Sequence, residues 1–207
     1  MNNWGSSAIY AMIIIIGILL VSAIAAGIIS ETGETNIEQD LTNITTEIID
    51  KYSTYIDIDC KLGKFYNIDG IQKIKKIALQ ISPLFSCEID ISQLTVQILN
   101  KEIVKLLNFN GVVEYYNGGS LFENSNWNDI TEDNFGFLVI NDLDESIFNY
   151  NVINENSDRA YLIFKLSEDI ALSKYDSLYV SIFLGNGISR SITLKAPLPI
   201  KSIAVFE

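Results

Sequence analysis

The sequence predicts an α+β protein in which a long N-terminal hydrophobic α-helix precedes an all-β domain of immunoglobulin-like sandwich type. Three observations predict this fold class. The first 30 of the 207 residues contain no charged side chain, and apolar residues then recur at helical spacing up to about residue 54. From residue 55 onward, short stretches with strand-like alternation are separated by turn-forming sequences. The chain is therefore predicted to consist of two domains, 1–54 and 55–207.

Residues 8–29 form the most hydrophobic segment of the chain. Outside the hydrophobic set this segment contains only two glycines and one serine. As a helix it would be about 33 Å long, which makes it a transmembrane candidate by length alone. However, no Lys or Arg precedes it, and the first one downstream is Lys51. The segment therefore lacks the basic flank of an ordinary signal peptide or membrane anchor.

The helical pattern continues beyond the apolar segment. Its apolar residues follow one another at spacings of three and four, and acids dominate the positions between them up to residue 50. This stripe consists of Ile37, Leu41, Ile44, Ile48 and Tyr52. We therefore predict one helix over about 6–54, whose first half must be surrounded and whose second half needs a partner on one face. A bundle of identical helices meets both requirements. The residues predicted to pack in the core of that bundle are Ile13, Ile16, Leu20, Ile24 and Ile28.

Residues 55–207 carry the pattern of about nine short strands. Residues 55–60 alternate strictly between polar and apolar side chains. The further strands are predicted at 74–81, 94–99, 112–116, 137–140, 161–166, 178–184, 188–195 and 203–206. Turn sequences at 67–70, 117–119, 154–158 and 185–187 separate them, and the last predicts a β-hairpin. Residues 100–107 are open to a second interpretation as a short helix.

The composition argues against several classes of function. The chain contains no histidine, which removes Ser-His-Asp triads, Cys-His pairs and HExxH zinc sites, and it has no nucleotide-binding glycine motif. We therefore predict a non-enzymatic protein without a cofactor. The net charge of −12 disfavours binding to nucleic acid and to anionic membrane surfaces.

Carboxylate groups are the only candidates for a metal site. The group Asp142, Asp144 and Glu145 is one of several that could bind a hard cation through oxygen ligands. None has the spacing of an EF-hand, and a solvated loop is the favoured interpretation. No metal site is predicted.

Two further features concern covalent modification. Asn43 begins the only N-x-[ST] sequon in the chain, which makes it the candidate glycosylation site. The two cysteines, Cys60 and Cys87, are too few for a structural zinc site. Outside the cell they could form a disulfide worth about 3 kcal/mol, and two separate buried thiols are the alternative.

Both ends of the chain resemble the archaellins, the archaeal flagellins. Residues 11–29 look like the N-terminal helix of that family, with its Ala-Ala-Gly ending. The segment I-D-I-S-Q-L at 89–94 is similar to an archaellin element, and residues 179–184, Pro197 and 203–206 look like the closing hairpin, proline and final strand. The middle of the chain, about 100–160, matches poorly. The usual basic leader ending in glycine is also missing, since the chain starts M-N-N-W-G, so the mature N-terminus stays open.

The resemblance implies a filament with the helices in its core and the β domains as an outer sheath, rotated by an envelope-anchored ATPase. Subunits of this family carry a type IV pilin-like leader and are commonly N-glycosylated, which suits Asn43. We therefore predict a structural subunit of an extracellular archaellum filament used for swimming motility. Its partners would be identical or closely related subunits, and it would meet the membrane only before assembly. The alternatives are a membrane-anchored surface binding or adhesion module, or a non-motile type IV-like pilin.

Overall fold

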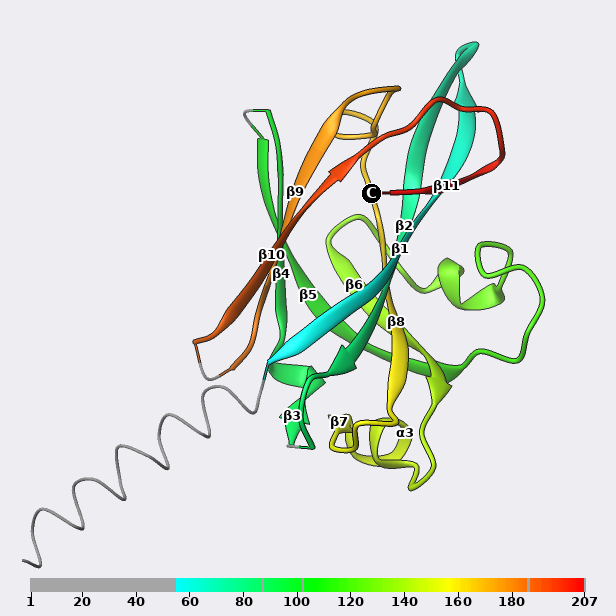
Figure 1. The fold of residues 1–207 in the computed structure, drawn as a ribbon. Coiled ribbons are helices and arrows are strands. Elements are labelled where there is room, and N and C mark those ends of the chain that lie inside the picture. The colour runs from blue at the N-terminus through cyan, green and yellow to red at the C-terminus, as the bar shows by residue number, and fades with distance from the viewer. Residues whose placement is uncertain (1–54, 87, 102, 186, 207) are drawn as a thin grey trace, which may run out of the picture. The chain divides into compact units, whose positions relative to one another are not determined.

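The computed structural model describes residues 55–206 except 87, 102 and 186 (Figure 1). In this part of the chain the predicted α+β class is wrong, because the described residues are almost entirely β and contain one short α-helix, α3 (Ser146–Tyr150). The long helix predicted over 6–54 lies outside the described residues. The boundary predicted between 54 and 55 stays a prediction for the same reason.

Nine strands form one hydrogen-bonded sheet in the order β10-β9-β4-β5-β6-β8-β2-β1-β11. Their bounds are β1 (Ile56–Ile68), β2 (Ile71–Pro83), β4 (Thr95–Asn100), β5 (Ile103–Tyr115), β6 (Asn134–Asn141), β8 (Arg159–Lys165), β9 (Ser177–Phe183), β10 (Ser189–Lys195) and β11 (Ile203–Val205). A separate pair is formed by β3 (Ile89–Asp90) and β7 (Val152–Ile153). Two 3-10 turns, η1 (Ile91–Gln93) and η2 (Ser125–Asn128), complete the described elements.

Strand β5 carries the sheet from one layer to the other. Its first half pairs antiparallel with β4, whereas its second half pairs parallel with β6. The pairing with β6 is irregular between Phe109 and Val113, and Gly111 lies there with a φ of +81°. Glycine adopts this conformation without a steric penalty, so the strand can bend at this point. The bend agrees with the predicted β sandwich.

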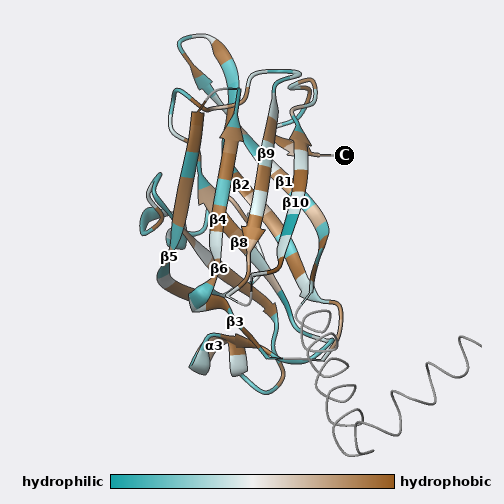
Figure 2. Cartoon of the chain, turned by 90° about the vertical axis from the view of Figure 1, so that its left-hand side faces the viewer, coloured by the Kyte–Doolittle hydropathy of each residue, from teal (hydrophilic) through white to brown (hydrophobic). Residues whose placement is uncertain are grey.

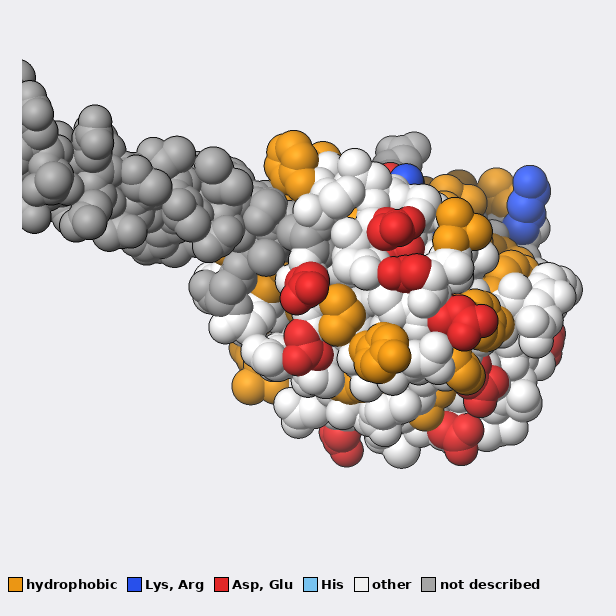
Figure 3. Space-filling model, turned by 90° about the horizontal axis from the view of Figure 1, so that it is seen from below, with side chains coloured by type: hydrophobic (Ala, Val, Ile, Leu, Met, Phe, Trp, Pro, Cys, Tyr) orange, Lys and Arg blue, Asp and Glu red, His pale blue; other side chains and the backbone are white. Residues whose placement is uncertain are grey.

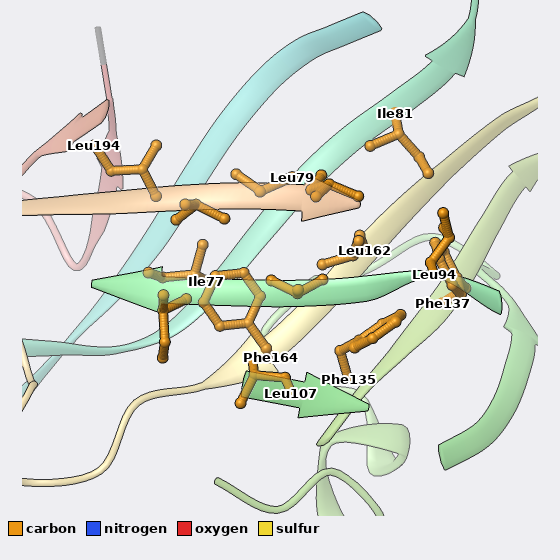
Figure 4. Close-up of a cluster of buried hydrophobic side chains, with 14 of the residues drawn as sticks. Ile77, Leu79, Ile81, Leu94, Leu107, Phe135, Phe137, Leu162, Phe164 and Leu194 are labelled. Carbon is orange, nitrogen blue, oxygen red and sulfur yellow. The ribbon is translucent and has the colours of Figure 1, made fainter. Parts of the chain in front are cut away.

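The main core lies between the two layers, as Figure 4 shows. Side chains from β2, β6 and β8 meet side chains from β4, β5 and β10 there, and all of them are essentially inaccessible to water. The labelled members are Ile77, Leu79, Ile81, Leu94, Leu107, Phe135, Phe137, Leu162, Phe164 and Leu194. Burial of each such side chain contributes about 1.5–3 kcal/mol, which makes this layer the main source of stability.

A second core lies on the outer face of β6, β8 and β2. Residues 116–133 cross that face and place Phe122 and Trp127 against Ala78, Leu138 and Ile163. We call residues 116–133 the covering loop. The two aromatic rings stack with centroids 5.6 Å apart, and the indole Nε1 of Trp127 donates a hydrogen bond of 2.8 Å to the carbonyl of Leu121. The central strands are therefore buried on both faces.

The described turns explain several outcomes of the sequence prediction. Asp69 and Gly70 both have positive φ, as a tight hairpin turn requires, so the turn predicted at 67–70 is confirmed. The hairpin predicted around 185–187 is confirmed by the pairing of β9 with β10. The helical alternative for 100–107 is wrong, because β5 begins at Ile103. No helix among the described residues is long and apolar enough to span a membrane.

Candidate functional site

Most of the site residues predicted from sequence lie outside the described residues. These are the packing residues Ile13, Ile16, Leu20, Ile24 and Ile28, together with the sequon residue Asn43. Cys60 is described, half-buried in β1, and forms no disulfide with any described residue. Its predicted partner, Cys87, lies outside the described residues, so this bridge stays a prediction.

The structure brings together three carboxylates at one end of the sandwich. Asp142, Asp144 and Asp158 each offer an oxygen, and the three oxygens lie within 4.8 Å of one another. Asp142 follows β6 and Asp158 precedes β8, and the pairing of Asn141 with Arg159 places these two strand ends side by side. Sequence spacing grouped Asp142 and Asp144 with Glu145, but it gave no signal for Asp158. Only the register of β6 against β8 reveals that residue.

Backbone donors hold all three carboxylates in place, and Asp144 accepts from the amide of Ser146 at 3.1 Å. Asp142, which is 8% exposed, accepts hydrogen bonds from the amides of Ser146, Ile147 and Phe148 at 3.0 to 3.2 Å. These are amides of the first turn of α3, which have no partner within the helix, so Asp142 satisfies them. The Oδ2 atom of Asp158 accepts from the amides of Asn154 and Glu155.

The cluster is electrostatically uneven. Burial raises the pKa of Asp142, and the adjacent carboxyls of Asp144 and Asp158 add to that rise. A hydrogen bond of 2.8 Å from the side-chain amide of Asn154 lowers the pKa of Asp144 to about 2. The Oδ1 atom of Asp158 is buried and has no hydrogen-bond donor among the described residues. A buried carboxylate oxygen without a donor carries a desolvation cost that a cation would offset.

The donor set suits a hard divalent cation. Ca²⁺ takes six to eight oxygen ligands at about 2.3–2.6 Å, so two carboxylate oxygens on one ion lie less than about 5 Å apart. Asp142 and Asp158 are both buried, which differs from the solvated loop favoured by the sequence. The prediction that the chain has no metal site is therefore open to a direct test at these three residues.

Lysines form a second group of like charges, on the outer face that the covering loop crosses. Lys64, Lys76 and Lys165 lie directly opposite one another on β1, β2 and β8. Burial lowers the pKa of Lys76, and the charge of Lys165 lowers it further. Like charges in register destabilise a sheet unless they are neutralised.

The covering loop neutralises this row. Glu123 lies 3.1 Å from the Nζ atom of Lys64, and the carbonyl of Phe122 accepts a hydrogen bond of 2.8 Å from Lys76. The ammonium of Lys76 also lies 4.9 Å from the centroid of the Trp127 ring, a cation–π contact. Burial lowers the pKa of Lys165, but the charges of Glu132 and Asp129 oppose that shift. The covering loop therefore compensates the charge of these lysines.

A pocket lies at the end of the sandwich opposite the three carboxylates. It has a volume of about 410 Å³, and Lys73, Asn100, Lys101 and Asp169 are among the residues that line it. A general acid needs a raised pKa, whereas the Ser167 hydroxyl lowers the pKa of Asp169. The carboxyl whose pKa is raised, Asp142, does not line this pocket.

Comparison with known proteins decides the family. The model of the archaeal-type flagellin family matches residues 5–194, which include both the charge-free segment and most of the β domain. The chain belongs to the archaeal-type flagellin family. The resemblance noted at the two ends of the sequence is thus confirmed, and the match also spans the middle of the chain.

Individual relatives agree with this assignment. Flagellin B3 of Methanocaldococcus jannaschii is 26% identical over 199 residues, covering 93% of this chain and 90% of the relative. The crystal structure of archaeal flagellin FlaB1 from the same organism superimposes with a TM-score of 0.63 at 18% identity, over 73% of this chain and 95% of that one. The archaeal flagellum of Methanospirillum hungatei matches over 100% of both chains with a TM-score of 0.51 at 10% identity. These two likenesses show a shared fold. As a flagellin of this family, the protein is a structural subunit of the archaellum filament, which lies outside the cell.

Proposed function

We propose that this flagellin is a non-enzymatic subunit that polymerises with identical or closely related copies through its charge-free N-terminal segment. The observation that carries the proposal is the family match over residues 5–194, which joins that segment to the β domain. In the filament, the apolar segment would be enclosed by the same segments of neighbouring copies, and the acidic β domains would face water. The archaellum then serves swimming motility.

Physical chemistry supports this arrangement. The 30 N-terminal residues carry no charge, and each large apolar side chain removed from water contributes about 1.5–3 kcal/mol. Ile13, Ile16, Leu20, Ile24 and Ile28 are the residues proposed to pack in the filament core. Before assembly the membrane offers the same segment an equally apolar environment. The net charge of −12 supports the proposal that nucleic acid is not a partner.

The non-enzymatic part of the proposal rests on chemistry that the chain lacks. No histidine is present in the sequence, and the pocket described above is lined by Asp169, whose pKa is lowered, and not by Asp142, whose pKa is raised. Glycosylation of Asn43 and a bridge between Cys60 and Cys87 belong to the same proposal, since both suit an extracellular filament.

A single buried charge tests the polymerisation. We expect Leu20→Asp in the full-length chain to abolish filaments, because an unpaired carboxylate in an apolar core is strongly unfavourable. Leu20→Val is the matched control, since it keeps the position apolar and should still give filaments. Negative-stain electron microscopy of sheared cell-surface material reads out both variants. Fibres of normal width and number from Leu20→Asp would contradict the proposed core.

A further inference from the structure

The outer face of β5, β4, β9 and β10 carries no charged side chain over three consecutive rows. The pairing of residues across neighbouring strands defines these rows. Leu99 pairs with Val104 on one side and with Tyr179 on the other, and each further row lies two residues along every strand. The rows are Val104–Leu99–Tyr179–Thr193, Leu106–Gln97–Ser181–Ser191 and Asn108–Thr95–Phe183–Ser189. We call these residues the uncharged face. It is the side of the domain turned toward the viewer in Figure 2.

Large apolar side chains of the uncharged face are open to solvent. Val104 is 56% exposed, Leu106 58%, Tyr179 52% and Phe183 37%. Val104 and Leu106 lie on β5 and Tyr179 and Phe183 on β9, and Leu99 of β4, which pairs with both Val104 and Tyr179, connects the two groups into one patch. Contiguous exposed apolar surface on a soluble domain marks an interaction site.

Two polar side chains of the uncharged face are paired with each other. The hydroxyls of Ser181 and Ser191, in the middle row, are hydrogen-bonded to each other at 2.8 Å. A partner that covers this pair would leave both oxygens in a hydrogen bond, and only one of the two hydroxyl protons would still need an acceptor. Covering the pair is therefore less costly than covering two unpaired hydroxyls, since each buried unsatisfied group costs about 1–3 kcal/mol.

In the proposed filament the neighbour available to this face is a second copy of the chain, and charge favours that occupant. Every copy carries a net charge of −12, so copies repel one another wherever their acids meet. The end of the domain that holds α3 illustrates this, because acidic side chains are spread across it and bases appear only near its margin (Figure 3). The uncharged face lets two copies approach without placing carboxylates against each other.

The size of the uncharged face indicates how it would be used. Four strands about 4.8 Å apart and three rows about 7 Å apart cover roughly 400 Å². This is about half of the 800 Å² that each partner contributes to a stable interface. The face is therefore too small to hold two free domains together. It is large enough to add stability between domains whose N-terminal segments already keep them close, because tethering raises their effective concentration.

We propose that the uncharged face is a lateral contact between the β domains of neighbouring copies in the filament, an inference that rests on the proposed function above. The contact orders the outer sheath, while the N-terminal segments supply most of the binding free energy. Subunits would then stay separate until their N-terminal segments are brought together.

Hydroxyl-radical footprinting on intact filaments tests this contact. The probe is radiolytic oxidation followed by mass spectrometry, and the reference is the same material dissociated into subunits. We expect the oxidation rates of Tyr179 and Phe183 to fall several-fold in filaments. Tyr150, which is 74% exposed and lies outside the uncharged face, should be oxidised about equally in both. Equal rates for Tyr179 in filaments and free subunits would overturn the contact and leave the proposed function intact. A failure of the unmodified chain to form filaments would overturn the proposed function itself.

A matched pair of variants supplies a second test. Leu106→Asp places a carboxylate on the uncharged face, and Ile200→Asp places one at an 83% exposed position in the loop before β11. Because both positions are open to solvent, the domain should fold in both variants, and circular dichroism checks this. We expect Leu106→Asp to raise the subunit concentration needed for assembly roughly tenfold, the size of one poorly paired charge at an interface. Ile200→Asp should leave it unchanged. Equal behaviour of the two variants, whether both normal or both impaired, would contradict the proposal.

Discussion

The two outer faces of the sandwich differ in how they are completed. On β6, β8 and β2 the covering loop buries Trp127 and supplies Glu123 to the lysine row. On β10, β9, β4 and β5 no described segment plays that part, and Leu106 and Tyr179 remain exposed. One sheet face is thus covered by residues of the same chain. The other is exposed and uncharged, as expected of a surface that a neighbouring copy covers. Apolar side chains on the covered face therefore stabilise the folded domain, whereas those on the uncharged face are available for contact between copies.

Removal of the largest side chain of the covered face should produce the largest effect. We expect Trp127→Ala to lower the free energy of unfolding by about 3–5 kcal/mol, because the side chain is 1% exposed and anchors the loop. Tyr179→Ala on the uncharged face should change it by less than about 0.5 kcal/mol in isolated subunits. Urea denaturation measures both free energies of unfolding, with circular dichroism of the backbone as the signal because it does not depend on Trp127. Similar losses in the two variants would remove the distinction between the faces.

The two groups of like charges invite the same comparison. The lysine row is neutralised by acids of the covering loop, but Asp142, Asp144 and Asp158 have no such loop. Arg159, the adjacent base, donates to the carbonyls of Asn156 and Asp158 and lies 3.6 Å from Asp59. A divalent cation would neutralise the charge of these carboxylates, as Glu123 neutralises that of Lys64.

We therefore expect Ca²⁺ to stabilise the folded subunit. At a concentration one hundred times its dissociation constant, a ligand that binds only the folded state adds about 2.7 kcal/mol. Thermal unfolding with Ca²⁺ and after chelation with EDTA measures this, and Asp158→Asn should remove most of the difference. Glu155→Gln is the control, since Glu155 is exposed and outside the three-carboxylate group. Identical melting temperatures with and without Ca²⁺ would show that the three carboxylates do not bind Ca²⁺.

Several parts of this structure were accessible from sequence for clear physical reasons. The turn between β1 and β2 and the β9–β10 hairpin were predicted because their sequences contain glycine among other turn-forming residues. The central strands were harder, since β6 and β8 are buried on both faces and show continuous apolar runs instead of alternation. The predicted strands at 137–140 and 161–166 therefore found these elements but missed their starts.

The uncharged face and the carboxylate cluster were hidden for different reasons. In β5, exposed Leu106 stands next to buried Leu107, so the alternation that marks a strand is absent and a helix was considered. An apolar residue on the solvent side imitates a core position in the sequence. Asp158 joins Asp142 only through the pairing of two strand ends, and no local spacing encodes that pairing.

Acid should act on the cluster through Asp144. Its pKa in the folded state is lowered to about 2, below the ordinary value of about 3.9 for Asp in an unfolded chain. A lowered pKa means that the ionised form favours folding. Its contribution is complete above about pH 4 and is lost as the pH falls towards 2. We expect Asp144→Asn to flatten this part of the stability profile in chelator-treated protein, measured by urea denaturation at several pH values. If the free energy of unfolding of the variant still fell in the same way below about pH 4, the loss of stability would come from other carboxyls.

The smallest effect should come from the charge that the covering loop offers to the lysine row. The carboxylate of Glu123 lies 3.1 Å from Lys64 but its side chain is 65% exposed, so water screens the pair. Exposed ion pairs contribute about 0–1 kcal/mol, and we expect Glu123→Gln to cost no more than that. The loop is then held mainly by Trp127 and Phe122, and its acids reduce the repulsion among the lysines of the row. A loss comparable with that of Trp127→Ala would reverse this order and make electrostatic attraction the main force that completes the covered face.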